Sequence, residues 1–118
     1  MIVGVAAATA VGAVLRFLLD TAITRRRRGA FPWGTFVINV LGAFVLGLVT
    51  ALAAHGHLGD APFDLLGPGL CAGLTTFSTW MWETLAAWRA GDRIVAASNI
   101  GLTVVAGCAA AAAGLALG

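Results

Sequence analysis

The chain has 118 residues, of which 60% are hydrophobic and only 10% are charged, and its mean hydropathy is +0.97. This composition excludes an ordinary soluble domain and indicates an integral membrane protein. Its formal net charge of +2 arises from seven basic and five acidic residues. We expect a single all-α domain over residues 1–118 with four transmembrane helices, the third of them broken near its middle.

The first predicted span covers about residues 2–23, close to the roughly 20 residues that cross the hydrocarbon core. Arg16 and Asp20 lie one helical turn apart near its end, where we expect them to anchor the helix. Four consecutive arginines follow, from Arg25 to Arg28. Between two spans, such a run is typical of a topology determinant or a contact with anionic lipid, and it does not indicate nucleic-acid binding.

The second predicted span covers about residues 32–54 and begins at Pro32, where a missing amide donor is harmless. Thr35 and Asn39 are four residues apart and therefore share one helical face. An asparagine at membrane depth is costly unless it is hydrogen-bonded. Asn39 therefore either ties two helices together or offers its N–H donors to a passing ligand.

A polar loop over residues 55–64 leads to the third predicted span, about residues 65–88. His55 and His57 in this loop make only a weak metal motif, because no third ligand is fixed. In the span itself, four hydroxyls occupy the five residues from Thr75 to Thr79. Lipid offers no water to satisfy them.

These hydroxyls therefore face protein, water or an ion, unless they simply bond back to the carbonyls of their own helix. Glycines and a proline just upstream predict a break between residues 69 and 76.

The fourth predicted span covers about residues 94–117. Asn99 and Thr103 share a face in its first half, and Gly107 and Gly114 offer close-packing positions further on. Four spans of this length enclose little space, so we expect any pathway to form between two subunits of a dimer.

Three segments of the chain combine into a specific pattern. They are Gly-Ala-Val-Leu-Arg at 12–16, Pro-Trp-Gly-Thr-Phe-Val-Ile-Asn-Val-Leu-Gly at 32–42, and Gly-Leu-Thr-Thr-Phe-Ser-Thr-Trp at 73–80 followed by Glu83. Together they resemble the CrcB/Fluc family of fluoride channels. The resemblance extends over nearly the whole chain, because the spacing of the four spans fits as well.

The resemblance implies a passive channel of the cell membrane that exports cytoplasmic fluoride. It also implies an antiparallel two-fold dimer with two pores and a sodium ion at its centre. Carried onto this sequence, the pore asparagine is Asn39 and the hydroxyl before it is Thr35. The first aromatic whose edge meets the anion is Phe77, and the second, usually phenylalanine, is Trp80. The tyrosine usual in the fourth helix is replaced by Asn99, and the hydroxyl one turn on is Thr103.

The resemblance also implies that sodium is held by main-chain carbonyls in the break, here those of Ala72 and Thr75. The usual Gly-Gly of the family is Ala72-Gly73 in this chain. Alanine keeps the carbonyl but adopts a positive φ poorly, so a site that needed positive φ would be disfavoured here.

The chemistry of fluoride favours the same residues. A small, strongly hydrated anion needs compact neutral donors in place of water, and a fixed cation would trap it. Neutral donors of this kind are Asn39, Thr35, Ser78, Thr79 and Thr103. Phe77 and Trp80 are three apart on one face, so they either present the positive edges of their rings to an anion or pack ordinarily. Trp80 can add its indole N–H.

Two other function classes compete with a channel. A small four-span proton-coupled multidrug exporter has a similar length but needs a carboxylate at mid-membrane. Asp20 lies near the end of its span and Glu83 follows the predicted break, so neither fits this role. A non-transporting helical scaffold leaves the hydroxyls at 75–79 unexplained. No nucleophile is paired with a base in the membrane, so we do not expect an enzyme.

The basic residues are distributed unevenly about the membrane. The loops at residues 25–28 and 89–93 lie on one side and hold six arginines, whereas the other side holds no lysine or arginine. The positive-inside rule therefore predicts one fixed orientation, with both arginine loops in the cytoplasm. An antiparallel dimer of identical chains needs both orientations. We therefore expect the second subunit to be a homologous chain of opposite bias, with a second copy of this chain as the alternative.

Overall fold

The computed structural model describes residues 1–118 and contains only helices and short connections. Three long helices are apolar enough to cross a membrane: α1 (Ile2–Arg26), α2 (Trp33–Ala54) and α6 (Arg93–Leu117). The remaining crossing, which is the third in chain order, consists of four helical segments. They are α3 (Asp60–Asp64), the π-helical segment η1 (Leu65–Cys71), α4 (Ala72–Leu74) and α5 (Ser78–Arg89). The expected all-α fold with a broken third crossing is confirmed.

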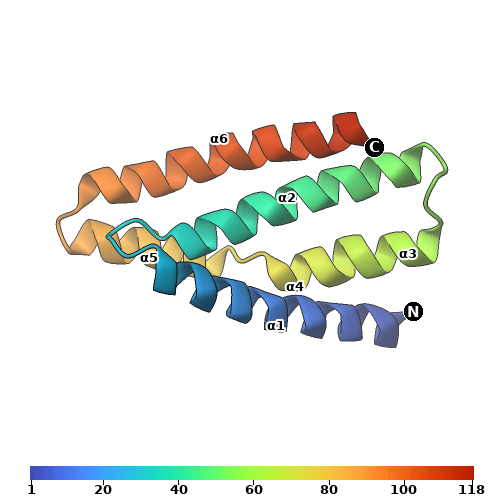
Figure 1. Ribbon diagram of the computed structural model, residues 1–118, viewed down its shortest axis with the longest axis horizontal. Helices are drawn as coiled ribbons and strands as arrows, with labels where there is room; N and C mark the ends of the chain where they lie inside the picture. Colours follow the sequence, from blue (N-terminus) through green and yellow to red (C-terminus); the bar gives the residue numbers. More distant parts are fainter.

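The four crossings run antiparallel to their neighbours in sequence (Figure 1). Both termini and the loop between α2 and α3 lie at one end of the bundle, where His55 Nδ1 is 3.1 Å from the carbonyl oxygen of Gly118. The loops that precede α2 and α6 lie at the opposite end. All six loop arginines are therefore gathered at one end, as the sequence predicts.

Small residues allow the closest helix contacts. A Cβ added to Gly47 would strike the Ala111 carbonyl, and one added to Gly114 would strike the Phe44 carbonyl, so α2 and α6 touch backbone to backbone. Gly12 of α1 packs in the same way, since a Cβ there would strike the Leu70 carbonyl of η1 and the backbone of α4. The expected close packing of Gly114 is confirmed, whereas Gly107 has open space where a Cβ would lie.

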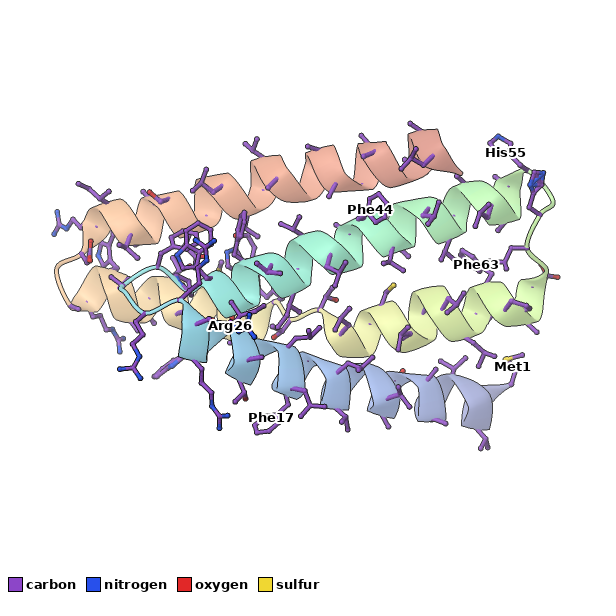
Figure 2. All side chains as sticks on the ribbon, in the orientation of Figure 1. Met1, Phe17, Arg26, Phe44, His55 and Phe63 are labelled. Atoms are coloured by element: carbon purple, nitrogen blue, oxygen red, sulfur yellow. The ribbon has the colours of Figure 1, made fainter.

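The bundle has a small core and a large apolar surface. Only 18 of its 118 residues are buried, and Ile38 and Asn99 are the largest side chains that are fully buried. Phe17 of α1 is 69% exposed and points away from the other helices (Figure 2). Because these surfaces lie at membrane depth, lipid or a second subunit covers them.

The third crossing differs from the sequence prediction in two places. Asp60 to Asp64, predicted as loop, form a helical turn because Pro62 lies in the first turn, where its missing amide donor costs nothing. The break lies at residues 75–77, at the end of the predicted range, and the chain from residue 69 to 74 stays helical. The wider π-helical turns of η1 accommodate Pro68, so the proline does not end the helix.

Candidate functional site

The break in the third crossing is held by Asn39 of α2. The Asn39 amide donates from Nδ2 to the Thr76 carbonyl at 3.0 Å, and its Oδ1 accepts from the Thr76 backbone N–H at 2.9 Å. Both backbone groups of Thr76, which a continuous helix would satisfy, are thus paired by one side chain. Of the two roles considered for Asn39, the structure shows that it ties two elements together. One N–H of its amide has no partner in this pairing.

The break also changes the hydrogen bonding of the main-chain carbonyls just before it. The Thr75 amide and hydroxyl both donate to the Cys71 carbonyl, at 3.0 and 2.9 Å. The hydrogen bonds outside the helices provide no donor for the carbonyls of Ala72, Gly73 and Leu74. Arg16 of α1 donates from Nη1 to the Thr75 carbonyl at 3.4 Å. Arg16 therefore contacts the break itself and is more than the helix anchor that its sequence position suggested.

Ala72 raises no conformational difficulty at this point. Its φ is −65°, an ordinary right-handed helical value, and no residue other than glycine has a positive φ in this chain. The substitution of alanine for the family's usual glycine therefore costs no backbone strain. Gly73 is the demanding position, since a Cβ there would strike the Thr9 carbonyl of α1.

Phe77 and Trp80 pack edge to face directly after the break. Their ring centroids are 5.8 Å apart with an interplanar angle of 77°. Phe77 is 71% exposed and does not contribute to the core of its own chain. The Trp80 indole N–H, by contrast, donates to the Asn99 carbonyl at 3.0 Å. It is therefore already engaged and is not a free donor for an anion.

Asn99 lies at the centre of a buried network between α5 and α6. Its Nδ2 donates to the Thr84 hydroxyl at 2.8 Å and to the Trp80 carbonyl at 3.4 Å, and the Thr84 hydroxyl donates to the same carbonyl. Asn99 is 0% exposed, so this side chain fixes the first turn of α5 against α6. Thr84 was not singled out from the sequence, although it lies one helical turn after Trp80.

The hydroxyls considered from the sequence divide among different surroundings. The Thr35 hydroxyl donates to the carboxylate of Glu83. Ser78 and Thr79 are exposed, and the backbone N–H of Thr79 donates to the Thr76 hydroxyl at 3.2 Å. Thr103 is only 7% exposed, and its hydroxyl has no hydrogen-bond partner.

Two cavities meet at the break. An open groove of about 710 Å³ between α2, the third crossing and α6 is lined by six of the predicted residues: Asn39, Ala72, Thr75, Phe77, Trp80 and Thr103. A smaller cavity of about 150 Å³ is lined by Arg16, Asp20, Thr35, Thr76 and Thr79. Ser78 lines neither. Asp20 and Glu83 lie on the arginine side of the break, in the lining of a third cavity.

Comparisons with known proteins identify the family of the chain. Over residues 3–115 the chain matches the family described as CrcB-like protein, Camphor Resistance (CrcB). It is 46% identical over 111 residues to fluoride-specific ion channel FluC 1 of Streptomyces avermitilis, covering 94% of this chain and 90% of that protein. It is 42% identical over 118 residues to FluC 1 of Frankia casuarinae, covering 96% and 92% of the two chains.

A further relative is fluoride-specific ion channel FluC 2 of Cutibacterium acnes, which is 50% identical over 110 residues, covering 91% of this chain and 88% of that protein. These relatives are named as channels and not as enzymes. With its long apolar helices, the chain is a multi-pass protein of the cell membrane, and it belongs to the CrcB family.

Proposed function

We propose that this chain forms a fluoride-selective channel, which exports cytoplasmic fluoride by passive electrodiffusion and so lowers its concentration in the cell. The relatives named as fluoride-specific ion channels support the choice of ion. One structural observation carries the proposal for the site. The Phe77 ring is 71% exposed beside the break that Asn39 holds, in a groove at membrane depth.

The anion pathway that we propose consists of neutral donors and ring edges. Phe77 and Trp80 lie edge to face, so at least one ring presents its positive edge outward. The remaining N–H of Asn39 and the exposed hydroxyls of Ser78 and Thr79 add hydrogen-bond donors, and the unpaired hydroxyl of Thr103 is a further one. The Thr35 hydroxyl can donate to an anion only after it leaves the Glu83 carboxylate, to which it donates in this structure. Arg16 is the cationic side chain nearest to the break. Its guanidinium already donates to the Thr75 carbonyl, so part of its hydrogen-bonding capacity is not available to an anion.

The pathway requires a second subunit. Phe77, Ser78 and Thr79 are exposed on the single chain although they lie in the middle of a crossing, where lipid cannot satisfy hydroxyls. An antiparallel two-fold dimer with two pores would cover the groove that Phe77 lines and would shield the exposed hydroxyls of Ser78 and Thr79 beside it from lipid. The charge bias favours a homologous chain of opposite orientation as the second subunit, because all six loop arginines lie at one end.

A sodium ion held by the carbonyls at the break is part of the proposal. No hydrogen bond outside the helices reaches the carbonyls of Ala72, Gly73 and Leu74, and main-chain oxygens are suitable ligands for a hard cation. The Thr75 carbonyl is the less suitable ligand, since the Arg16 guanidinium already contacts it. A sodium ion held by Ala72 and Thr75 would act structurally, by joining the breaks of two subunits.

Fluoride efflux from liposomes tests the channel directly. The purified protein is reconstituted with internal potassium fluoride, and efflux is followed with a fluoride electrode after valinomycin is added. Chloride-loaded liposomes are the control for selectivity. Rapid fluoride efflux without chloride efflux is expected, and absence of fluoride efflux from correctly folded protein would exclude the proposal.

The same liposomes address the multidrug-exporter alternative, which the relatives do not support. An exporter would acidify or alkalinise the lumen in response to a lipophilic cation, whereas a passive fluoride channel would not.

A further inference from the structure

The arginine end of the bundle contains a cavity that the ion pathway does not use. It has a volume of about 660 Å³ and opens between the end of α1, the loop that follows it and α5. Three of the four consecutive arginines line it: Arg25, Arg27 and Arg28. All three are exposed, so their guanidinium groups are available to a ligand.

Tryptophans hold two arginines in place at this end. The Arg27 guanidinium lies 5.2 Å from the ring centroid of Trp33, and the Arg93 guanidinium lies 4.6 Å from that of Trp88. Tryptophan rings at the ends of transmembrane helices lie at the level of the lipid headgroups. Stacking on Trp33 therefore fixes the Arg27 guanidinium, which lines the cavity, at headgroup depth with its N–H groups free to bind a phosphate. Arg93 is stacked in the same way but lies outside the cavity.

Two carboxylates also line the cavity, and both lie deeper than the arginines. Asp20 precedes Arg25 by five residues, which is about 7.5 Å of helix rise. It accepts a hydrogen bond from the Thr24 hydroxyl at 3.4 Å, and Glu83 accepts one from Thr35. An anion held at the rim by the three arginines therefore lies some distance from the two carboxylates. Both carboxylates also already accept hydrogen bonds from protein hydroxyls.

We propose that this cavity binds the phosphate headgroup of an anionic phospholipid. Guanidinium groups bind phosphate oxygens in pairs, and the arginine rim matches that chemistry. A lipid is favoured over a soluble phosphate because α1 exposes Phe17 and Leu18, by 69% and 55%, about 12 and 11 Å of helix rise deeper in the membrane than Arg25. These side chains offer an apolar surface along which acyl chains can lie. The proposal does not depend on which ion the chain conducts.

Thermal unfolding of the full-length protein in detergent tests the site. Short-chain phosphatidylglycerol is compared with phosphatidylcholine of the same chain length and with inorganic phosphate. Saturating phosphatidylglycerol should raise the unfolding midpoint by at least about 3 °C, and the other two should leave it unchanged. A variant with Arg25→Gln, Arg27→Gln and Arg28→Gln should lose this shift. The matched control with Arg89→Gln and Arg93→Gln, outside the cavity, should keep it.

A milder variant covers the case in which the triple variant fails to fold. Arg27→Lys retains the charge but loses the planar fork, so it should lose more than half of the shift. An equal shift with inorganic phosphate would identify a soluble-phosphate site and overturn the lipid proposal. Equal loss of the shift in the control variant would reduce the effect to general surface charge. If no shift occurs and the triple variant instead slows ion flux in neutral lipid, the arginines serve the transported anion and the proposal is wrong.

Discussion

Replacement of Asn39 by leucine should weaken the fold at the break and abolish fluoride flux. Leucine has the same number and branching of side-chain heavy atoms as asparagine but is bulkier and has no polar atoms, so the Thr76 N–H and carbonyl both lose their partner. Each buried backbone group left without a partner costs about 1–3 kcal/mol. The two together amount to about 2–6 kcal/mol, reduced by the gain of leucine burial. Because Phe77 follows Thr76 directly, its ring also loses its fixed position in the groove.

The free energy of unfolding is measured by denaturant titration in mixed micelles, and flux by the fluoride electrode. Thr50→Val is the matched control, since the Thr50 hydroxyl is exposed on the same helix and bonds only to the Leu46 carbonyl. That variant should change stability by less than about 0.5 kcal/mol. If Asn39→Leu is as stable as the control and conducts normally, Asn39 does not hold the break. Asn39→Asp retains the bond from the Thr76 N–H but faces the carbonyl with an oxygen, so it should block flux by repelling the anion.

Three further predictions concern other parts of the chain. Phe77→Ile should leave folding unchanged, because the ring is 71% exposed, yet it should abolish flux for want of a polarised ring edge; normal flux would reject that role. Gly12→Ala should destabilise the protein by about 1–3 kcal/mol in thermal or chemical unfolding, because its Cβ meets the Leu70 carbonyl of η1 and the backbone of α4. Gly101→Ala, with open space around it and outside the groove, is the control and should be close to neutral. Single cysteines at Gly29 and Gly118, in a cysteine-free background, should label from opposite sides of the membrane when the chain is expressed alone. Equal labelling of each from both sides would mean dual topology and would refute the need for a second homologous chain.

Much of the fold follows from composition and local pattern. Long apolar runs separated by charged or polar loops predict four crossings because the bilayer core accepts little else. The positions at which the helices begin and end were less predictable. α1 continues to Arg26, since arginine is a good helix former and its side chain reaches water. The break lies at residues 75–77, and not nearer to Pro68, because the π-helical turns of η1 accommodate the proline. No sequence rule predicts such turns.

The site was predictable as a set of residues and not as a set of pairings. The hydroxyls and aromatic rings concentrated at residues 75–80 indicate a polar function inside the membrane. The amide side chain of Asn39 on another helix suggests a hydrogen-bond partner for them. The sequence does not reveal which hydrogen-bond partner each of these side chains has. The sequence offers the Trp80 indole N–H as a further donor for an anion, whereas in the structure it donates to the Asn99 carbonyl. Thr35 and Asn39 share a face, yet one binds Glu83 and the other binds Thr76. Such pairings depend on how the helices cross, which periodicity leaves open.

The break also brings two opposite helix ends to one depth in the membrane. α4 ends at Leu74 and α5 begins at Ser78, so the negative end of one macrodipole and the positive end of the next are separated by three residues. Each end carries roughly half an elementary charge, which is screened little where water is scarce. A cation is therefore attracted to the carbonyl end and an anion to the amide end, at neighbouring positions. A change that rejoined α4 and α5 into one continuous helix would remove both charges together, so the proposed cation site and the proposed anion path would be lost in the same variant.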